Sequence, residues 1–295
     1  MDVSEIGEAL VTAVTGGLRP EIVVVPASVG PLQCRIWGDS GDPVVLVVHG
    51  NGGLGLWWAP LVAALVPGWR VVAPDLRGHG ESAWAEPPSY RMEDFAGDLD
   101  SIGRALALGR VPIVGHSMGG RIAAWYALHR AATVRGLAVL DTRFDPVDAA
   151  VVAQYRSLAA GTRQGRGYPS RDAAMAAFRF VPDEDDVPAA VVRMLAWHAA
   201  HERAPGDWTF RFDRAVLSLD GDGAGDLRPT LPDIACPTWV VGGANSWVCD
   251  AAQRSRIAGA MRHVTTTEFP GGHHFLLTHG AAVGHALRQF LDRLA

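Results

Sequence analysis

Short apolar runs alternate with amphipathic stretches along most of this chain. The clearest run, Val44–Val48, is apolar at every position, which is typical of a strand buried on both faces of a sheet. The stretch 90–108 instead spaces its apolar side chains by four, three and four residues, at Phe95, Leu99, Ile102 and Leu106. This spacing predicts a helix with one apolar face.

The same patterns predict the other core elements. Strands are expected at 22–25, 32–37, 69–73, 111–114, 137–140, 238–241 and 264–269, and helices at 57–65, 121–130, 251–259 and 281–294. Pro26, Gly30 and Pro31 separate the first two strands, which we expect to form an antiparallel pair. Because strands and helices alternate from there on, we expect an α/β fold: a doubly wound, mainly parallel sheet covered by helices on both faces.

The alternation stops between two well-patterned parts of the chain. We therefore divide it into a core from 1–144, an inserted helical lid at 145–230, and the rest of the core at 231–295. Helices are expected in the lid at 147–160, 170–178 and 188–200. Trp197 and Trp208 are expected either to line the substrate pocket or to form the core of the lid.

Composition narrows the class of protein. The chain of 295 residues is 48% hydrophobic with a net charge of −5 and no basic cluster, so nucleic acid is not an expected partner. Three widely spaced cysteines argue against a disulfide framework and fit the cytoplasm. The first residues lack the basic region of a secretory signal, and the apolar runs are too short for a membrane span. We expect a cytoplasmic protein with a small-molecule substrate and no membrane partner, and leave open whether it forms a homodimer.

One short stretch carries the strongest chemical signal. The run 111–114 ends abruptly at Gly115-His116-Ser117-Met118-Gly119, and the predicted helix follows at once. A strand, a tight turn and a helix are the context that a nucleophile elbow needs. The residues two before and two after the nucleophile must lack side chains in so tight a turn, and both are glycine here. In this context the motif resembles the α/β-hydrolase family. The alternative is an ordinary Gly-rich turn.

The resemblance implies a histidine base and an oxyanion hole. The family's base lies in a Gly-His turn after the last strand, which is the position of His273; His274 is the alternative base and otherwise a pocket-wall or packing residue. The family's oxyanion hole uses two backbone amides, which correspond here to Met118 and Asn51, in a loop that His49 is expected to fix.

Four further side chains are expected to contact the substrate. They are His116, His274 and the two tryptophans that follow the oxyanion loop, Trp57 and Trp58. One of these tryptophans is expected to line the pocket, and helix packing is the alternative for each.

The resemblance also implies a catalytic triad, in which an acidic side chain orients the histidine base. The position of this acid is where the sequence departs from the commoner family pattern. The usual position, in the turn after the strand 238–241, holds Asn245, which cannot stabilise an imidazolium by charge. Some members of the family carry the acid 24 residues after the nucleophile, and Asp141 stands there at the end of a predicted strand. The alternatives are that Asp141 caps this turn and that Asp145, or less favourably Asp250, is the acid. Asp250 is expected to cap a helix.

A second family motif, at 75–82, contains a carboxylate with a different expected role. Asp75 is expected to bond backbone N–H groups of its own turn, so its role is structural rather than catalytic.

The family resemblance implies a reaction class rather than a substrate. The same triad serves esterases, lactonases, thioesterases, C–C bond hydrolases and cofactor-free haloperoxidases, whereas Ser117 in place of aspartate argues against dehalogenases and epoxide hydrolases. We expect a serine hydrolase that cleaves a carboxylic ester, lactone or thioester of a small, mostly apolar molecule through an acyl-enzyme. The alternatives are a biosynthetic lyase, a cyclase or a C–C bond hydrolase with the same triad, and a non-catalytic binder. We expect no cofactor and no metal.

Overall fold

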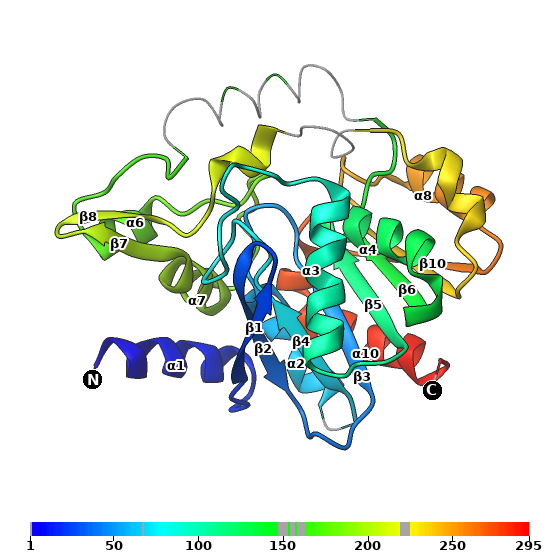
Figure 1. Cartoon of the computed structure of the whole chain (residues 1–295), viewed down its shortest axis with the longest axis horizontal. Coiled ribbons are helices and arrows are strands. Elements are labelled where there is room, and N and C mark those ends of the chain that lie inside the picture. Colours follow the sequence, from blue (N-terminus) through cyan, green and yellow to red (C-terminus); the bar gives the residue numbers. More distant parts are fainter. Residues whose placement is uncertain are drawn as a thin grey trace.

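The computed structural model describes residues 2–66, 68–146, 153, 157, 163–218 and 225–294. Its centre is an eight-stranded sheet with the order β1-β2-β4-β3-β5-β6-β9-β10 (Figure 1). The strands are β1 (Glu21–Ala27), β2 (Gly30–Trp37), β3 (Val44–Val48), β4 (Arg70–Pro74), β5 (Val111–His116), β6 (Val134–Leu140), β9 (Thr238–Gly243) and β10 (Val264–Phe269). The predicted antiparallel pair is β1 with β2, and β2 also runs antiparallel to β4. All the other pairs are parallel, as expected.

Helices cover both faces of this sheet (Figure 1). The first group is α1 (Val3–Val14), α2 (Ala59–Leu65), α9 (Phe275–Thr278) and α10 (Gly280–Asp292); the second is α3 (Met92–Ala105), α4 (Met118–His129) and α8 (Ala251–Ala260). Alternate residues of β3 belong to the two hydrophobic cores on opposite faces of the sheet. Val45 and Val47 lie in the core beneath the first group of helices, and Leu46 and Val48 lie in the core beneath the second group. This is why the strand is apolar at every position.

The segment between β6 and β9 contains both helices and strands. It includes α6 (Arg171–Ala176), α7 (Ala189–Ala199), and an antiparallel hairpin of β7 (Ala200–Ala204) and β8 (Asp207–Phe210). The two described helices match those expected at 170–178 and 188–200. The hairpin was not predicted, because strand β7 carries polar side chains at three consecutive positions, His201, Glu202 and Arg203. The helix expected at 147–160 lies almost entirely outside the described residues.

Short 3-10 helices join several of these elements. They are η1 (Gly55–Trp58), η2 (Ala131–Thr133), η3 (Arg214–Ser218) and η5 (Arg228–Asp233). None of the helices in the described part of the chain is both long and apolar enough to cross a membrane.

Candidate active site

Ser117 sits in a strained turn between β5 and α4. Its backbone angles are φ 56° and ψ −121°, a region that non-glycine residues rarely adopt. A Cβ at Gly115 would overlap the Gly119 carbonyl, and a Cβ at Gly119 would overlap the carbonyls of Val48 and His49. The two glycines of the motif are therefore required by close backbone approach, as the sequence predicted, and the turn leaves Ser117 half-buried at the carboxyl edge of the sheet.

Asp141 and His273 meet beside this turn. Asp141 follows β6 and His273 follows β10, and Asp141 Oδ2 lies 2.6 Å from His273 Nδ1. The predicted hydrogen bond between the two residues is therefore present. Both side chains are buried, so the contact is shielded from water. Within the described residues, no hydrogen bond joins Ser117 Oγ to His273.

Two further donors hold the Asp141 carboxylate. Its Oδ1 accepts a hydrogen bond of 3.0 Å from the Gly243 amide, and its Oδ2 accepts one of 2.5 Å from the Ser246 hydroxyl. Ser246 follows Asn245, in the turn where the family usually places its acid. Sequence analysis missed Ser246, although its position in that turn was the available signal.

The other carboxylates and Asn245 have different partners. Asp145 pairs with Arg228 and Arg256, each at 3.4 Å, and Asp250 caps α8 as predicted, through a 2.7 Å bond from the Gln253 amide. The side chain of Asn245 is exposed, and its backbone amide donates to the Gly271 carbonyl. Of these carboxylates, Asp141 is the one that contacts His273.

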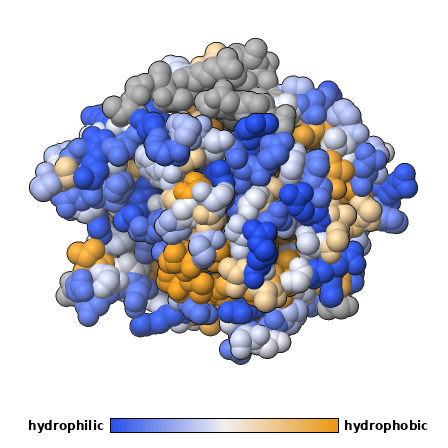
Figure 2. All heavy atoms as spheres, viewed as in Figure 1, coloured by the Kyte–Doolittle hydropathy of each residue, from blue (hydrophilic) through white to orange (hydrophobic). Residues whose placement is uncertain are grey.

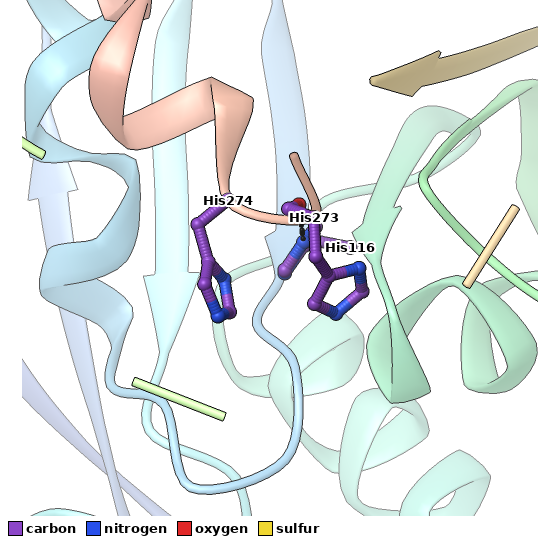
Figure 3. Close-up of side chains that lie close together, drawn as sticks. All are labelled: His116, His273 and His274. Atoms are coloured by element: carbon purple, nitrogen blue, oxygen red, sulfur yellow. Dashed lines mark hydrogen bonds between the residues drawn. The ribbon is translucent and has the colours of Figure 1, made fainter. Parts of the chain in front are cut away.

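Three histidine rings cluster at the end of the sheet (Figure 3). His116 Nε2 donates to the backbone carbonyl of His273 at 3.0 Å, and the ring centroids of His273 and His274 are 4.8 Å apart. Burial lowers the pKa of His116 well below its ordinary value, with further contributions from His273 and His274. Burial, followed by the effect of His273, also lowers the pKa of His274 to about 2. His116 and His274 are therefore neutral at pH 7.

The same three rings form a group with metal-ligand chemistry. One nitrogen from each ring lies within 4.8 Å of the others. His273 Nδ1 is already bonded to Asp141, so a metal would have to use His273 Nε2. That nitrogen is the atom a serine nucleophile needs as its base, so metal binding here would compete with such chemistry.

The loop after β3 lies directly against Ser117. A Cβ at Gly50 would lie 3.0 Å from Ser117 Cβ. As predicted, His49 fixes this loop: its Nδ1 donates to the Gly50 carbonyl at 2.8 Å, and its Nε2 accepts from the Leu76 amide at 3.0 Å. The backbone amides of Asn51 and Met118 donate to no acceptor among the described residues. Both remain free to bind an oxygen atom.

His79 and Asp75 hold the same loop from the motif at 75–82. His79 Nε2 accepts from the Gly52 amide at 3.1 Å, while its Nδ1 donates to the Arg77 carbonyl at 2.9 Å. Burial, and then neighbouring His49, lowers the pKa of His79 to about 3, which keeps this acceptor neutral.

Asp75 has the structural role that the sequence predicted. Its carboxylate accepts from the amides of Gly55 and Glu81, at 2.7 and 3.1 Å, and pairs with Arg35 at 2.8 Å. Burial alone would raise the pKa of Asp75, but Arg35 and the Gly55 amide outweigh it, and the pKa lies below its ordinary value.

A cavity of about 200 Å³ opens beside this loop. Asn51, Leu54 and Trp57 line it from the core side, and four phenylalanines line it from the segment between β6 and β9: Phe178, Phe180, Phe210 and Phe212. Trp57 is therefore the tryptophan that faces the cavity, whereas Trp58 is buried among core side chains. Neither Trp197 nor Trp208 lines it. The walls are mostly apolar and aromatic, with Arg179 and Arg211 as the charged residues among those described.

Glu184 links the inserted segment to the histidine loop. Its two carboxylate oxygens accept from the His274 amide at 3.0 and 3.1 Å, and burial raises its pKa. Phe180 lies beside the His274 ring, with centroids 5.2 Å apart. Sequence analysis did not assign a role to Glu184. Glu184 belongs to an acidic run at 183–186, and a run of charges is more often a solvated surface, so the sequence gives no local signal for this contact.

Comparisons with known proteins agree with this architecture. The sequence profile of the alpha/beta hydrolase fold family matches residues 43–280. An esterase of Mycobacterium tuberculosis is 30% identical, over 94% of this chain and 91% of its own. The crystal structure of E-2-(acetamidomethylene)succinate hydrolase superposes with a TM-score of 0.80 at 24% identity, covering 93% of this chain and 100% of its own. The thioesterase domain from the curacin biosynthetic pathway gives a TM-score of 0.76 at 25% identity, covering 92% and 99%.

Proposed function

Because this chain belongs to the alpha/beta hydrolase fold family and is an enzyme of that class, we propose that it is a serine hydrolase with Ser117 as nucleophile. Its substrate is a carboxylic ester, lactone or thioester of a small, mostly apolar molecule. The observation that carries this proposal is the buried hydrogen bond of 2.6 Å between Asp141 and His273, next to the strained turn of Ser117.

The proposed reaction begins with proton transfer from Ser117. His273 Nε2 removes the hydroxyl proton as Ser117 Oγ attacks the carbonyl carbon, and Asp141 holds the ring by its Nδ1–H and stabilises the imidazolium. His273 then gives the proton to the leaving oxygen or sulfur, which departs and leaves an acyl-enzyme. In the second half of the reaction, His273 Nε2 removes a proton from a water molecule as the water oxygen attacks the acyl carbon. His273 then returns this proton to Ser117 Oγ, and the carboxylic acid is released. The contact between Ser117 and His273 tightens when substrate binds, as it often does in such enzymes.

Two amides supply the oxyanion hole in this proposal. The amides of Met118 and Asn51 donate to the oxygen that becomes negative in the tetrahedral intermediate. Met118 is also the first residue of α4, so the positive end of the helix dipole faces the same oxygen. His49 and His79 keep the Asn51 loop in place, which fixes these donors before the reaction begins.

The aromatic cavity supports an apolar group on the substrate. A volume of about 200 Å³ lined by phenylalanines favours a short acyl chain or a small ring. The relatives named as an esterase and as a thioesterase domain support an ester or thioester bond. We further propose that residues 145–230 act as a cap that selects the substrate. We also propose a cytoplasmic location, which the free cysteines support.

The proposal is tested by hydrolysis of p-nitrophenyl butyrate. Ser117→Ala should lower kcat by about 10³-fold or more, and Asp141→Asn by about 10²- to 10⁴-fold. Asn245→Asp, added to Asp141→Asn, should restore part of the loss if a carboxylate in that turn reaches His273. Asp145→Asn is the matched control and should keep the wild-type rate. Wild-type activity in Ser117→Ala or in Asp141→Asn would overturn the proposal.

A further inference from the structure

A second cavity lies between α1, the sheet edge and the inserted segment. Its volume is about 420 Å³, and of the described residues that line it only Arg211 also lines the aromatic cavity beside the Asn51 loop. Val3 and Val11 of α1 and Ile22 of β1 form an apolar side. Figure 2 shows the apolar patch over β1, next to α1, and Ile22 in this strand is 51% exposed.

A close contact between α1 and α7 closes one side of the cavity. A Cβ at Gly7 would lie 3.2 Å from Trp197 Nε1, so a larger residue here would require the Trp197 ring to shift by a few tenths of an ångström. His198 Nε2 bonds the Gly7 carbonyl at 3.2 Å, and burial, followed by Arg35, lowers the pKa of His198 to about 4. The ring of His198 therefore acts as a neutral donor that fixes the helix, and it adds no charge to the cavity.

Arg171 is held in this cavity by two tryptophans. Its guanidinium carbon lies 4.2 Å from the ring centroid of Trp197 and 4.6 Å from that of Trp208. Stacking of this kind occupies the faces of the guanidinium and leaves its N–H edge open. Among the described residues, no side chain forms a hydrogen bond or an ion pair with the guanidinium of Arg171, which lines the cavity. Burial, and then repulsion from Arg211, lowers its pKa, while the more distant carboxylates of Glu202 and Asp172 oppose this change.

The other arginines that line the cavity already have carboxylate partners. Arg19 pairs with Glu8 at 2.8 Å, Arg35 with Asp75 at 2.8 Å, and Arg211 with Glu81 at 2.5 Å. Among the described residues that line the cavity, Arg171 is therefore the arginine without a carboxylate within ion-pair distance. Glu8 and Glu81 also line the cavity but are paired with Arg19 and Arg211, so the single guanidinium of Arg171 matches a ligand with one negative charge.

We propose that this cavity is a binding site, separate from the Ser117 pocket, for a small organic monoanion. The carboxylate of the ligand accepts from the N–H edge of Arg171, and its apolar body packs against Val11, Ile22 and Trp197. A planar guanidinium whose faces are stacked suits a carboxylate, because it can donate two parallel hydrogen bonds. The proposal of this binding site does not depend on the function proposed for Ser117.

The test is isothermal titration calorimetry with 4-phenylbutyrate as the probe. The neutral amide of the same acid and inorganic phosphate are titrated in parallel, on the full chain. We expect saturable binding of one 4-phenylbutyrate, and binding of the amide and of phosphate that is at least about ten-fold weaker. Arg171→Met keeps an apolar side chain between the tryptophans and should weaken 4-phenylbutyrate binding about ten-fold or more.

Matched variants separate this site from other sources of binding. Arg166→Met removes a guanidinium that lies 5.5 Å from the Tyr168 ring and does not line the cavity, so it should leave binding unchanged. Phe180→Leu alters the aromatic cavity beside the Asn51 loop and should also leave binding unchanged. Thermal unfolding checks that each variant folds. The comparison of 4-phenylbutyrate with its neutral amide is made on the wild-type protein and so does not depend on any variant. Equal binding of the amide, unchanged binding in Arg171→Met, loss of binding in Phe180→Leu, or no binding at millimolar probe would each overturn the proposal.

Discussion

Asp141 accepts hydrogen bonds from His273 and from Ser246 on the same oxygen, Oδ2, at 2.6 and 2.5 Å. The Gly243 amide binds the other oxygen at 3.0 Å. Three donors thus fix the rotation of a fully buried carboxylate, so that one oxygen stays directed at the imidazole. In the proposed mechanism, this arrangement holds the histidine ring before the substrate arrives.

Ser246→Ala tests the contribution of the hydroxyl. Loss of one hydrogen bond to a buried carboxylate costs about 1–2 kcal/mol, so kcat should fall about ten-fold while KM changes little. Ser246→Thr keeps the hydroxyl and should recover most of the rate. Asn245→Ala, at the exposed neighbouring position, is the control and should be neutral. A wild-type kcat in Ser246→Ala would show that Gly243 and His273 hold Asp141 without it.

Glu184→Ala tests the link between the inserted segment and the histidine loop. Its removal leaves the His274 amide without its acceptor, so the loop that carries His273 should loosen and kcat should fall several-fold. Glu184→Gln keeps one acceptor oxygen and should retain most of the activity. Asp185→Ala, an exposed change in the same acidic run, serves as control and should behave like the wild type. Equal losses in Glu184→Ala and Asp185→Ala would contradict this role.

Phe180→Ala tests the aromatic cavity as the substrate pocket. Phe180 is buried against Trp57, with ring centroids 5.8 Å apart, and its truncation enlarges the cavity. The ratio of kcat/KM for p-nitrophenyl octanoate to that for the butyrate should rise about ten-fold, because the space left by one phenyl ring buries about two of the four additional methylenes at about 0.8 kcal/mol each. Trp247→Ala removes an exposed aromatic ring that does not line the cavity and should leave the ratio unchanged. An unchanged ratio in Phe180→Ala would place the acyl chain elsewhere.

The buried side chain of His79 makes the free energy of unfolding depend on pH. Its pKa is lowered from 6.5 to about 3, so between these values the unfolded chain binds a proton that the folded chain does not. The free energy of unfolding should therefore fall as the pH decreases from about 6.5 towards 3.

A substitution measures how much His79 contributes to the pH dependence of the free energy of unfolding. In His79→Gln, the slope of the free energy of unfolding against pH should decrease below pH 6 by up to about 1.4 kcal/mol per pH unit. Urea unfolding at several pH values measures the slope. His285→Gln, at an exposed position, is the control. An unchanged slope in His79→Gln would contradict the account.

The sequence was informative where local pattern determines structure. Val44–Val48 is buried on both faces, and its uniform apolar character marked it as a strand. Asp141 was found because some members of the resembled family carry the acid 24 residues after the nucleophile, and this position follows a predicted strand. By contrast, α1 was not predicted, although Asp2 at its N-cap and Glu5 form a capping box; the sequence analysis considered the first residues only as a possible secretory signal.

Contacts that join distant parts of the chain were not predictable in the same way. Ser246 reaches Asp141 only because β6 and β9 are neighbours, with Leu140 paired to Val241. Glu184 reaches the His274 amide across 90 positions of sequence. Such partners depend on register and on packing of the inserted segment, which a single sequence does not encode as a local pattern.

The most direct test of the central claim is the rate at which a fluorophosphonate labels this protein, followed by intact mass and peptide mapping. The account predicts one adduct, on the peptide that contains Ser117, with no adduct in Ser117→Ala and labelling of Asp141→Asn slowed by about 10²-fold or more. An unlabelled wild type, under conditions that fully label a known serine esterase, would contradict the account, as would equal labelling of Ser117→Ala.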